Sequence, residues 1–133
     1  GIYAFRDDEK LWKGEEIQPA IVKAIQESKI AIIVLSENYA ASLFCLDELA
    51  TILECAKSKG LLILPVFYNV EPSDVRHQKG SYGEALAKHE TRLKHNLEKL
   101  KKWKKALRQV ANLSGFYVKH GYPTLPIFLL YNF

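Results

Sequence analysis

The chain is poor in the features that would place it outside the cell or in a membrane. It has two cysteines, Cys45 and Cys55, and they lack the CxxC spacing of redox and metal motifs. No apolar run reaches the roughly 18 residues that a transmembrane helix needs. The first ten residues show no basic segment followed by an apolar stretch, so they do not resemble a signal peptide. These absences predict a cytoplasmic protein with reduced thiols.

Motifs of several enzyme classes are also missing. There is no glycine-rich phosphate fingerprint of the GxGxxG or GxxxxGK[ST] type, and no serine lies in a GxSxG elbow. His77, His89, His95 and His120 are scattered and form no metal-ligand pattern with the cysteines. We therefore expect no metal site and no nucleophilic serine.

The composition is that of one globular domain. The 133 residues are 48% hydrophobic and 26% charged, which suffices for a real core and argues against disorder. The net charge of +4 is mildly basic and favours solubility more than nucleic-acid binding. The lysine-rich stretch at residues 94–108 flanks a leucine and tryptophan stripe, so its lysines are expected to face solvent on an amphipathic helix. Nucleic-acid binding remains the weakest alternative.

Apolar periodicity predicts alternating strands and helices. Residues 30–35 and 61–68 are short continuous apolar runs, typical of strands buried on both faces, and residues 2–5 and 114–118 are shorter candidates. Pro65 inside the second run predicts a bulge or a bent strand. Helices are expected at residues 14–27, 46–57, 81–90 and 93–111, with a loop at 69–80 and a capping box formed by Ser81 and Glu84. This alternation predicts an α/β domain with a parallel sheet.

The segment at residues 36–48 is the best candidate for chemistry. It is predicted to follow the carboxyl end of a strand and to lead into a helix, and ligands bind at that edge of open α/β sheets. Glu48 is expected early in this helix, next to free backbone donors. Spacing alone does not distinguish a catalytic Glu48 from an ordinary surface glutamate of a helix.

Several motifs in one order resemble the plant Toll/interleukin-1 receptor (TIR) domain of intracellular immune receptors. They are FRDD at 5–8, IIVLSENYA at 32–40, CLDEL at 45–49, PVFY at 65–68, PSDVR at 72–76, GSYGEA at 80–85 and VANLSG at 110–115. The resemblance implies a flavodoxin-like three-layer fold over residues 1–119, lacking the usual first strand and helix. The absent strand would lie between residues 2–5 and 30–35, so an exposed edge is expected there. Residues 120–133 form an atypical apolar tail, interrupted by Pro123 and Pro126.

The resemblance further implies an NAD+ hydrolase that acts in plant defence signalling and depends on self-association with other TIR domains. Glu48 matches the family's catalytic glutamate, NAD+ is the substrate, and no separate cofactor is implied. The substrate-binding candidates are Arg6, Trp12, Ser36, Phe44 and Cys45. Structural alternatives stay open for several of them: a helix cap for Ser36, a core aromatic for Phe44, a buried apolar thiol for Cys45, and packing under the loop for Trp12. The implied location is the cytoplasm, with the nucleus as a second compartment. The rival function is a non-catalytic module that binds other TIR domains.

Overall fold

The computed structural model describes residues 2–5, 19–94, 96–119 and 128–131, with side chains described for residues 22–94 and 96–119. Its strands are β1 (Ile2–Phe5), β2 (Ile30–Leu35), β3 (Leu62–Tyr68), β4 (Phe116–Val118) and β5 (Phe128–Tyr131). Its helices are α1 (Pro19–Glu27), the 3-10 turn η1 (Tyr39–Ala41), α2 (Leu43–Lys59), α3 (Pro72–His77), α4 (Gly80–Arg92) and α5 (Leu97–Ala111).

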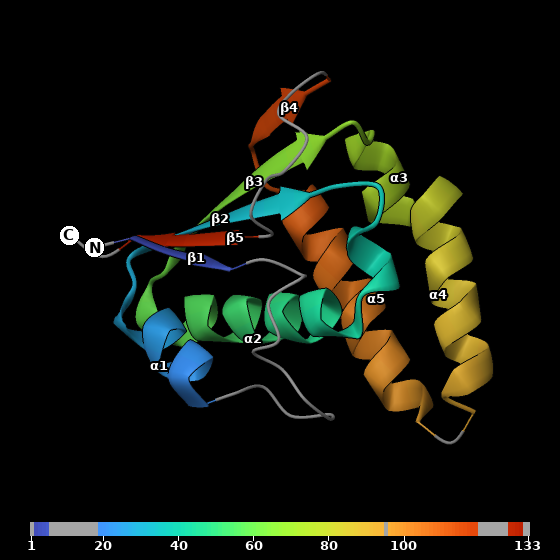
Figure 1. Cartoon of the computed structure of the whole chain (residues 1–133), viewed down its shortest axis with the longest axis horizontal. Helices are drawn as coiled ribbons and strands as arrows, with labels where there is room; N and C mark the ends of the chain where they lie inside the picture. Colours follow the sequence, from blue (N-terminus) through green and yellow to red (C-terminus); the bar gives the residue numbers. More distant parts are fainter. Residues whose placement is uncertain (1, 6–18, 95, 120–127, 132–133) are drawn as a thin grey trace.

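The strands form one sheet in the order β1-β5-β2-β3-β4 (Figure 1). β2, β3 and β4 are parallel neighbours, and a helix-containing connection joins each to the next. Apolar runs form β2 and β3 because each of these strands lies between two neighbouring strands, a position that apolar side chains favour. The predicted α/β class with a parallel sheet is confirmed.

The apolar tail contributes a strand that the sequence does not predict. β5 lies antiparallel between β1 and β2, and Tyr131 pairs with Ile2 on one side and with Ile30 on the other. The expected exposed edge at residues 30–35 is therefore wrong, because residues 128–131 hydrogen-bond to it. β5 lies beyond the predicted domain boundary at residue 119, so part of the predicted tail belongs to the sheet.

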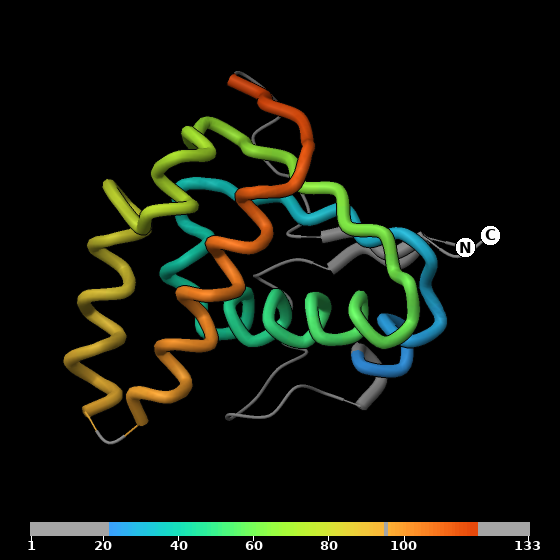
Figure 2. Tube along the Cα trace, turned by 180° about the vertical axis from the view of Figure 1, so that it is seen from behind, coloured from blue at the N-terminus to red at the C-terminus, as the bar shows by residue number. Residues whose placement is uncertain are grey.

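The helices cover one face of the sheet. In Figure 1, α1 and α2 lie below the strands, and α5 packs against both α2 and β3. Figure 2 shows α4 and α5 as antiparallel neighbours joined by a short connection. No described helix lies above the sheet, so the described residues make two layers. The core between them is built around the buried rings of Trp103, Tyr39 and Tyr82.

Alternate side chains of the central strands face the helices. Ile33, Leu35 and Phe67 belong to the core, whereas Ile32 is half-buried and Leu62 is 61% exposed. The face toward the helices is thus the more deeply buried one, and on the other face Val34 is the only described residue that is buried, contrary to the expectation of strands buried on both faces. We call the second face the open face; its described residues are Ile30, Ile32, Val34, Leu62, Leu64, Val66, Tyr68, Phe116 and Val118.

Helix α2 begins three residues earlier than predicted. The Ser42 hydroxyl caps it by accepting a hydrogen bond from the Cys45 amide at 3.2 Å. The helix ends at Lys59, where Gly60 adopts a left-handed conformation with φ of 70°. This shift places Glu48 in the second turn, beyond the free amides of the helix start.

Two other helix predictions are wrong in detail. The predicted loop at residues 69–80 contains α3, which starts with Pro72. Proline suits the first position of a helix, because a backbone N–H there would have no partner within the helix. Helix α4 starts at Gly80 without a side-chain cap, so the predicted capping box of Ser81 and Glu84 is not formed.

Of the two alternatives predicted at Pro65, a bulge or a bent strand, the bulge is absent. The register of β2 and β3 runs through Pro65 without an inserted residue, and the ladder between β3 and β4 begins only at Val66. The chain passes closely over this point, since a Cβ on Gly115 would lie 2.1 Å from the Pro65 carbonyl oxygen. Glycine at position 115 is therefore what lets β4 start beside β3.

Candidate active site

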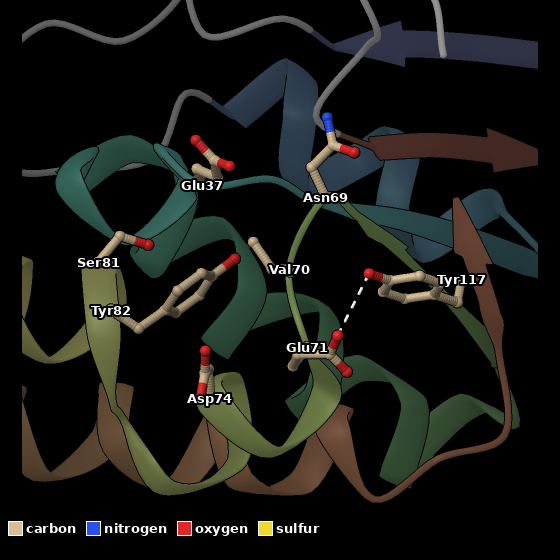
Figure 3. A pocket seen from close by; sticks show the side chains of 8 residues that line it. All are labelled: Glu37, Asn69, Val70, Glu71, Asp74, Ser81, Tyr82 and Tyr117. Carbon is tan, nitrogen blue, oxygen red and sulfur yellow. Dashed lines mark hydrogen bonds between the residues drawn. The ribbon is translucent and has the colours of Figure 1, made fainter. Parts of the chain in front are cut away.

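A pocket opens at the edge of the sheet where β2, β3 and β4 end (Figure 3). Its volume is about 280 Å³. It is lined by Glu37, Asn69, Val70, Glu71, Asp74, Ser81, Tyr82 and Tyr117. The topology rule for open α/β sheets thus correctly predicts a hollow at this edge.

The pocket is acidic and is separate from the predicted site. Three carboxylates and no lysine or arginine line it, and the Tyr117 hydroxyl donates to Glu71 Oε1 at 3.3 Å. The Tyr82 hydroxyl donates instead to the backbone carbonyl of Ser36 at 2.7 Å. None of the four described residues predicted for the site lines this pocket. Sequence reasoning identified this edge of the sheet but missed the residues that line the pocket, although the short polar segments after β2 and β3 were a usable signal.

Glu48 is fully buried. It is 0% exposed, and neither carboxyl oxygen has a hydrogen-bond partner among the residues that the structure describes. Burial, and secondarily the negative charge of Asp47, raise the pKa of Glu48 from an ordinary 4.5 to about 8. At neutral pH this carboxyl is therefore mostly protonated. The expected position of Glu48 next to the free amides of the helix start is wrong, because α2 begins at Leu43 and Glu48 is its sixth residue.

Helix α2 brings three of the predicted residues together. Phe44 and Cys45 precede Glu48 by four and three residues, so all three share one side of the helix. Both neighbours belong to the core, with Phe44 at 6% and Cys45 at 1% exposed. The Tyr39 hydroxyl donates to the Cys45 carbonyl at 3.1 Å, which fixes this turn against η1. The result is an apolar setting for a single carboxyl group.

The other predicted residues do not belong to this group on α2. Ser36 follows β2 and is half-buried, and its carbonyl also accepts the Tyr39 amide at 3.2 Å. Arg6 and Trp12 lie outside the described residues, so their predicted roles stay predictions. Among the residues that the structure describes, no group of three His, Cys, Asp or Glu side chains could hold a metal ion. None of the described helices is long and apolar enough to cross a membrane.

Asp47 is held by two groups from α5. The Trp103 indole N–H donates to Asp47 Oδ1 at 2.9 Å, and the Lys99 ammonium lies 3.5 Å from Oδ2. Lys99 also lies over the Trp103 ring, 5.5 Å from its centroid. His89 meets the same ring edge to face, with the centroids 5.5 Å apart. Sequence reasoning missed this cluster, although an acidic residue next to Glu48 was a visible signal.

Comparison with known proteins decides the family. Residues 1–124 match the sequence profile described as "TIR domain". The chain belongs to the TIR domain family. It is 51% identical over 125 residues to disease resistance protein RUN1 of Vitis rotundifolia, covering 92% of this chain and 9% of that protein. It is 46% identical over 115 residues to TMV resistance protein N of Nicotiana glutinosa, covering 86% of this chain and 10% of that protein. This TIR chain spans about a tenth of the length of these relatives.

A solved structure shares the fold. The TIR domains of the activated Roq1 resistosome, which directly recognises the pathogen effector XopQ, superpose with a TM-score of 0.76 at 44% identity. The match covers 85% of this chain and 68% of that one. The predicted flavodoxin-like α/β fold and the predicted relation to plant TIR disease resistance proteins are confirmed.

Proposed function

We propose that this TIR domain hydrolyses NAD+ in plant immune signalling, with Glu48 as the essential carboxylate. The observation that carries the proposal is the unpaired, buried Glu48 carboxyl, held on a helix with Phe44 and Cys45 on the same side. Leaving a buried carboxyl without a hydrogen bond costs stability, and such groups cluster at functional sites. The named relatives are disease resistance proteins, which supports the immune context.

Cleavage of NAD+ requires one main contribution from the protein, which is a fixed negative charge near the ribose. The nicotinamide of NAD+ is already cationic, so it departs as a neutral ring without a general acid. Positive charge then develops on the ribose as an oxocarbenium ion, which a nearby carboxylate stabilises. Water then adds to the ribose carbon and completes hydrolysis. Phe44, Cys45, Ser36, Arg6 and Trp12 stay proposed contacts to the substrate.

The protonation of Glu48 fits this chemistry once substrate is bound. A carboxyl with a pKa of about 8 is largely neutral at pH 7. A cationic pyridinium beside it favours the ionised form and lowers its pKa. The domain therefore keeps the group neutral in the absence of substrate and ionises it when the cation arrives. We expect turnover to rise with pH as Glu48 loses its proton.

The test is release of nicotinamide from NAD+ by the purified chain, measured by chromatography over a range of protein concentrations. Glu48→Gln should abolish release, because it keeps the shape and removes the charge. Glu54→Gln is the matched control. Because Glu54 is exposed on the same helix, this variant should release nicotinamide at the rate of the parent chain. Because the Roq1 TIR domains belong to an assembled resistosome, the rate per chain should also rise with concentration. Equal rates for Glu48→Gln and the parent would refute the catalytic role.

A second candidate function is a non-catalytic TIR module that binds other TIR domains. The observation that favours it is the same Glu48, which is fully buried and whose pKa burial raises to about 8. This candidate predicts no nicotinamide release at any concentration, from a chain that still co-sediments with a TIR domain of a resistance protein. The nicotinamide assay therefore separates the two functions directly.

A further inference from the structure

The two acidic residues of α2 point in different directions and have opposite surroundings. Consecutive helical residues are about 100° apart around the axis, so Asp47 and Glu48 cannot face the same neighbour. Asp47 faces α5, where Trp103 donates a hydrogen bond to Oδ1 and the Lys99 ammonium forms an ion pair, without a hydrogen bond, with Oδ2; among the described residues, neither oxygen of Glu48 has a hydrogen-bond partner. A carboxylate that is fixed by two groups defines the rotation of its helix, and thereby the direction of the next side chain.

We propose that Asp47 is a positioning residue for Glu48: clamped to α5 by Trp103 and Lys99, it fixes the first turns of α2 and sets a negative charge beside the unpaired carboxyl. This inference rests on the proposed function of Glu48, which it deepens. Asp47 touches neither substrate nor the reacting bond, and it acts through Glu48 alone.

The contacts of the clamp are protected from water. Trp103 is 1% exposed, and the side chains of Lys99 and Asp47 are 24% and 11% exposed. A hydrogen bond to a charged group in such a setting is stronger than one between exposed groups. By contrast, the pair of Lys101 and Glu98 on the outer side of α5 is 74% and 84% exposed. The clamp is therefore a fixed feature of the fold, and the outer pair is not.

The charges around Glu48 come from few elements. On α2 the neighbour is Asp47, whose charge favours the protonated form of Glu48. On α5, Lys99 pairs with Asp47, and on α4 the His89 ring packs on the Trp103 ring, with its Nε2 2.8 Å from the Ala40 carbonyl oxygen. Strand β2 carries no ionisable side chain, and the Tyr39 hydroxyl of η1 donates to the Cys45 carbonyl. Asp47 is thus the described charge through which α5 influences Glu48.

The experiment follows the protonation of Glu48 by NMR titration of 13C-labelled glutamate carboxyls, assigned by comparison with Glu48→Gln. In Asp47→Asn the amide oxygen still accepts from Trp103, but the negative charge is gone. We expect the Glu48 midpoint to fall by on the order of one pH unit. The pH profile of nicotinamide release should shift to lower pH by the same amount. A purely structural Asp47 would leave both midpoints in place, and that outcome overturns the proposal.

Two further variants keep the proposal testable if Asp47→Asn does not fold. Lys99→Gln leaves the Asp47 charge uncompensated, so the Glu48 midpoint should rise; no change or a fall would contradict the proposal. Lys101→Gln is the matched control, because it removes an equal charge from the exposed side of α5 and should shift nothing. If the parent releases no nicotinamide while these midpoints move as stated, the proposed function fails, whereas the electrostatic effect of Asp47 on Glu48 stands.

Discussion

At the residue scale, the decisive feature is a carboxyl group that the fold keeps neutral. A glutamate in water ionises near pH 4.5, but Glu48 does so near pH 8 because burial disfavours its charged form. The folded state therefore binds a proton that the unfolded chain releases between these two values. The stability that protonation of Glu48 contributes is fully present below the unfolded pKa and is lost as the pH rises through the folded one.

The unfolding free energy should accordingly fall as the pH rises from about 5 to 8, by roughly 1.4 kcal/mol per pH unit from this group. Glu48→Gln should remove that slope, since its amide does not titrate. Urea unfolding at several pH values measures the effect, and Glu54→Gln should keep the slope of the parent chain because Glu54 is exposed. A Glu48→Gln variant with an unchanged slope would mean that another group binds the proton.

At the element scale, sequence predicts what is local and misses what is not. Apolar runs and helical stripes identify β2, β3 and α2, because burial dictates their pattern. The start of α2 is misjudged by three residues because the Ser42 cap outweighs the apolar stripe. Because of that error, Glu48 is expected beside free backbone amides, and a buried carboxyl group without a hydrogen bond is not predicted. β5 is missed because its partners lie about a hundred residues away and no local pattern encodes them.

The hydrogen bonds of β5 can be tested separately from its side chains. Leu130→Pro removes an N–H from a strand that is paired on both sides, so the chain should melt at a lower temperature. Leu130→Ala is the matched control, because it shortens the side chain and keeps the N–H. Amides of β1 should also lose hydrogen-exchange protection in the proline variant, since β1 pairs with β5. Equal protection of Tyr3 and Ala4 in both variants would exclude this pairing in solution.

The contact between β4 and β3 depends on one glycine. In Gly115→Ala the new methyl group would meet the Pro65 carbonyl at 2.1 Å, so the backbone must move, with an expected loss of about 2 kcal/mol or more. Gly60→Ala is the control, because open space surrounds that position and only its positive φ of 70° opposes the change, by about 1 kcal/mol. Chemical denaturation measures the unfolding free energy of both variants. A smaller loss of unfolding free energy for Gly115→Ala than for Gly60→Ala would contradict the close approach of Gly115 to Pro65.

At the scale of the whole molecule, helices cover one face of the sheet in the described residues and leave the open face with apolar groups in water. Leu62 and Phe116 are each 61% exposed there. Apolar surface of this kind drives association, so the isolated chain should bind an apolar dye and scatter light at high concentration. Leu62→Thr with Phe116→Thr should reduce both signals. Leu97→Thr, on the helical side, should leave them unchanged although Leu97 is 49% exposed.

The pairing of Ile2 with Tyr131 places these two residues of β1 and β5 side by side (Figure 1). Residues 132, 133 and 1 would then be a three-residue loop if the ends were ligated, a length at which antiparallel strands commonly form a hairpin. If the circular chain were opened in the connection between α4 and α5, β5 and β1 would become neighbours in sequence, whereas in the parent chain their pairing has the largest sequence separation among the described strands. Such a permutant should fold faster than the parent, because its loop-closure entropy is smaller.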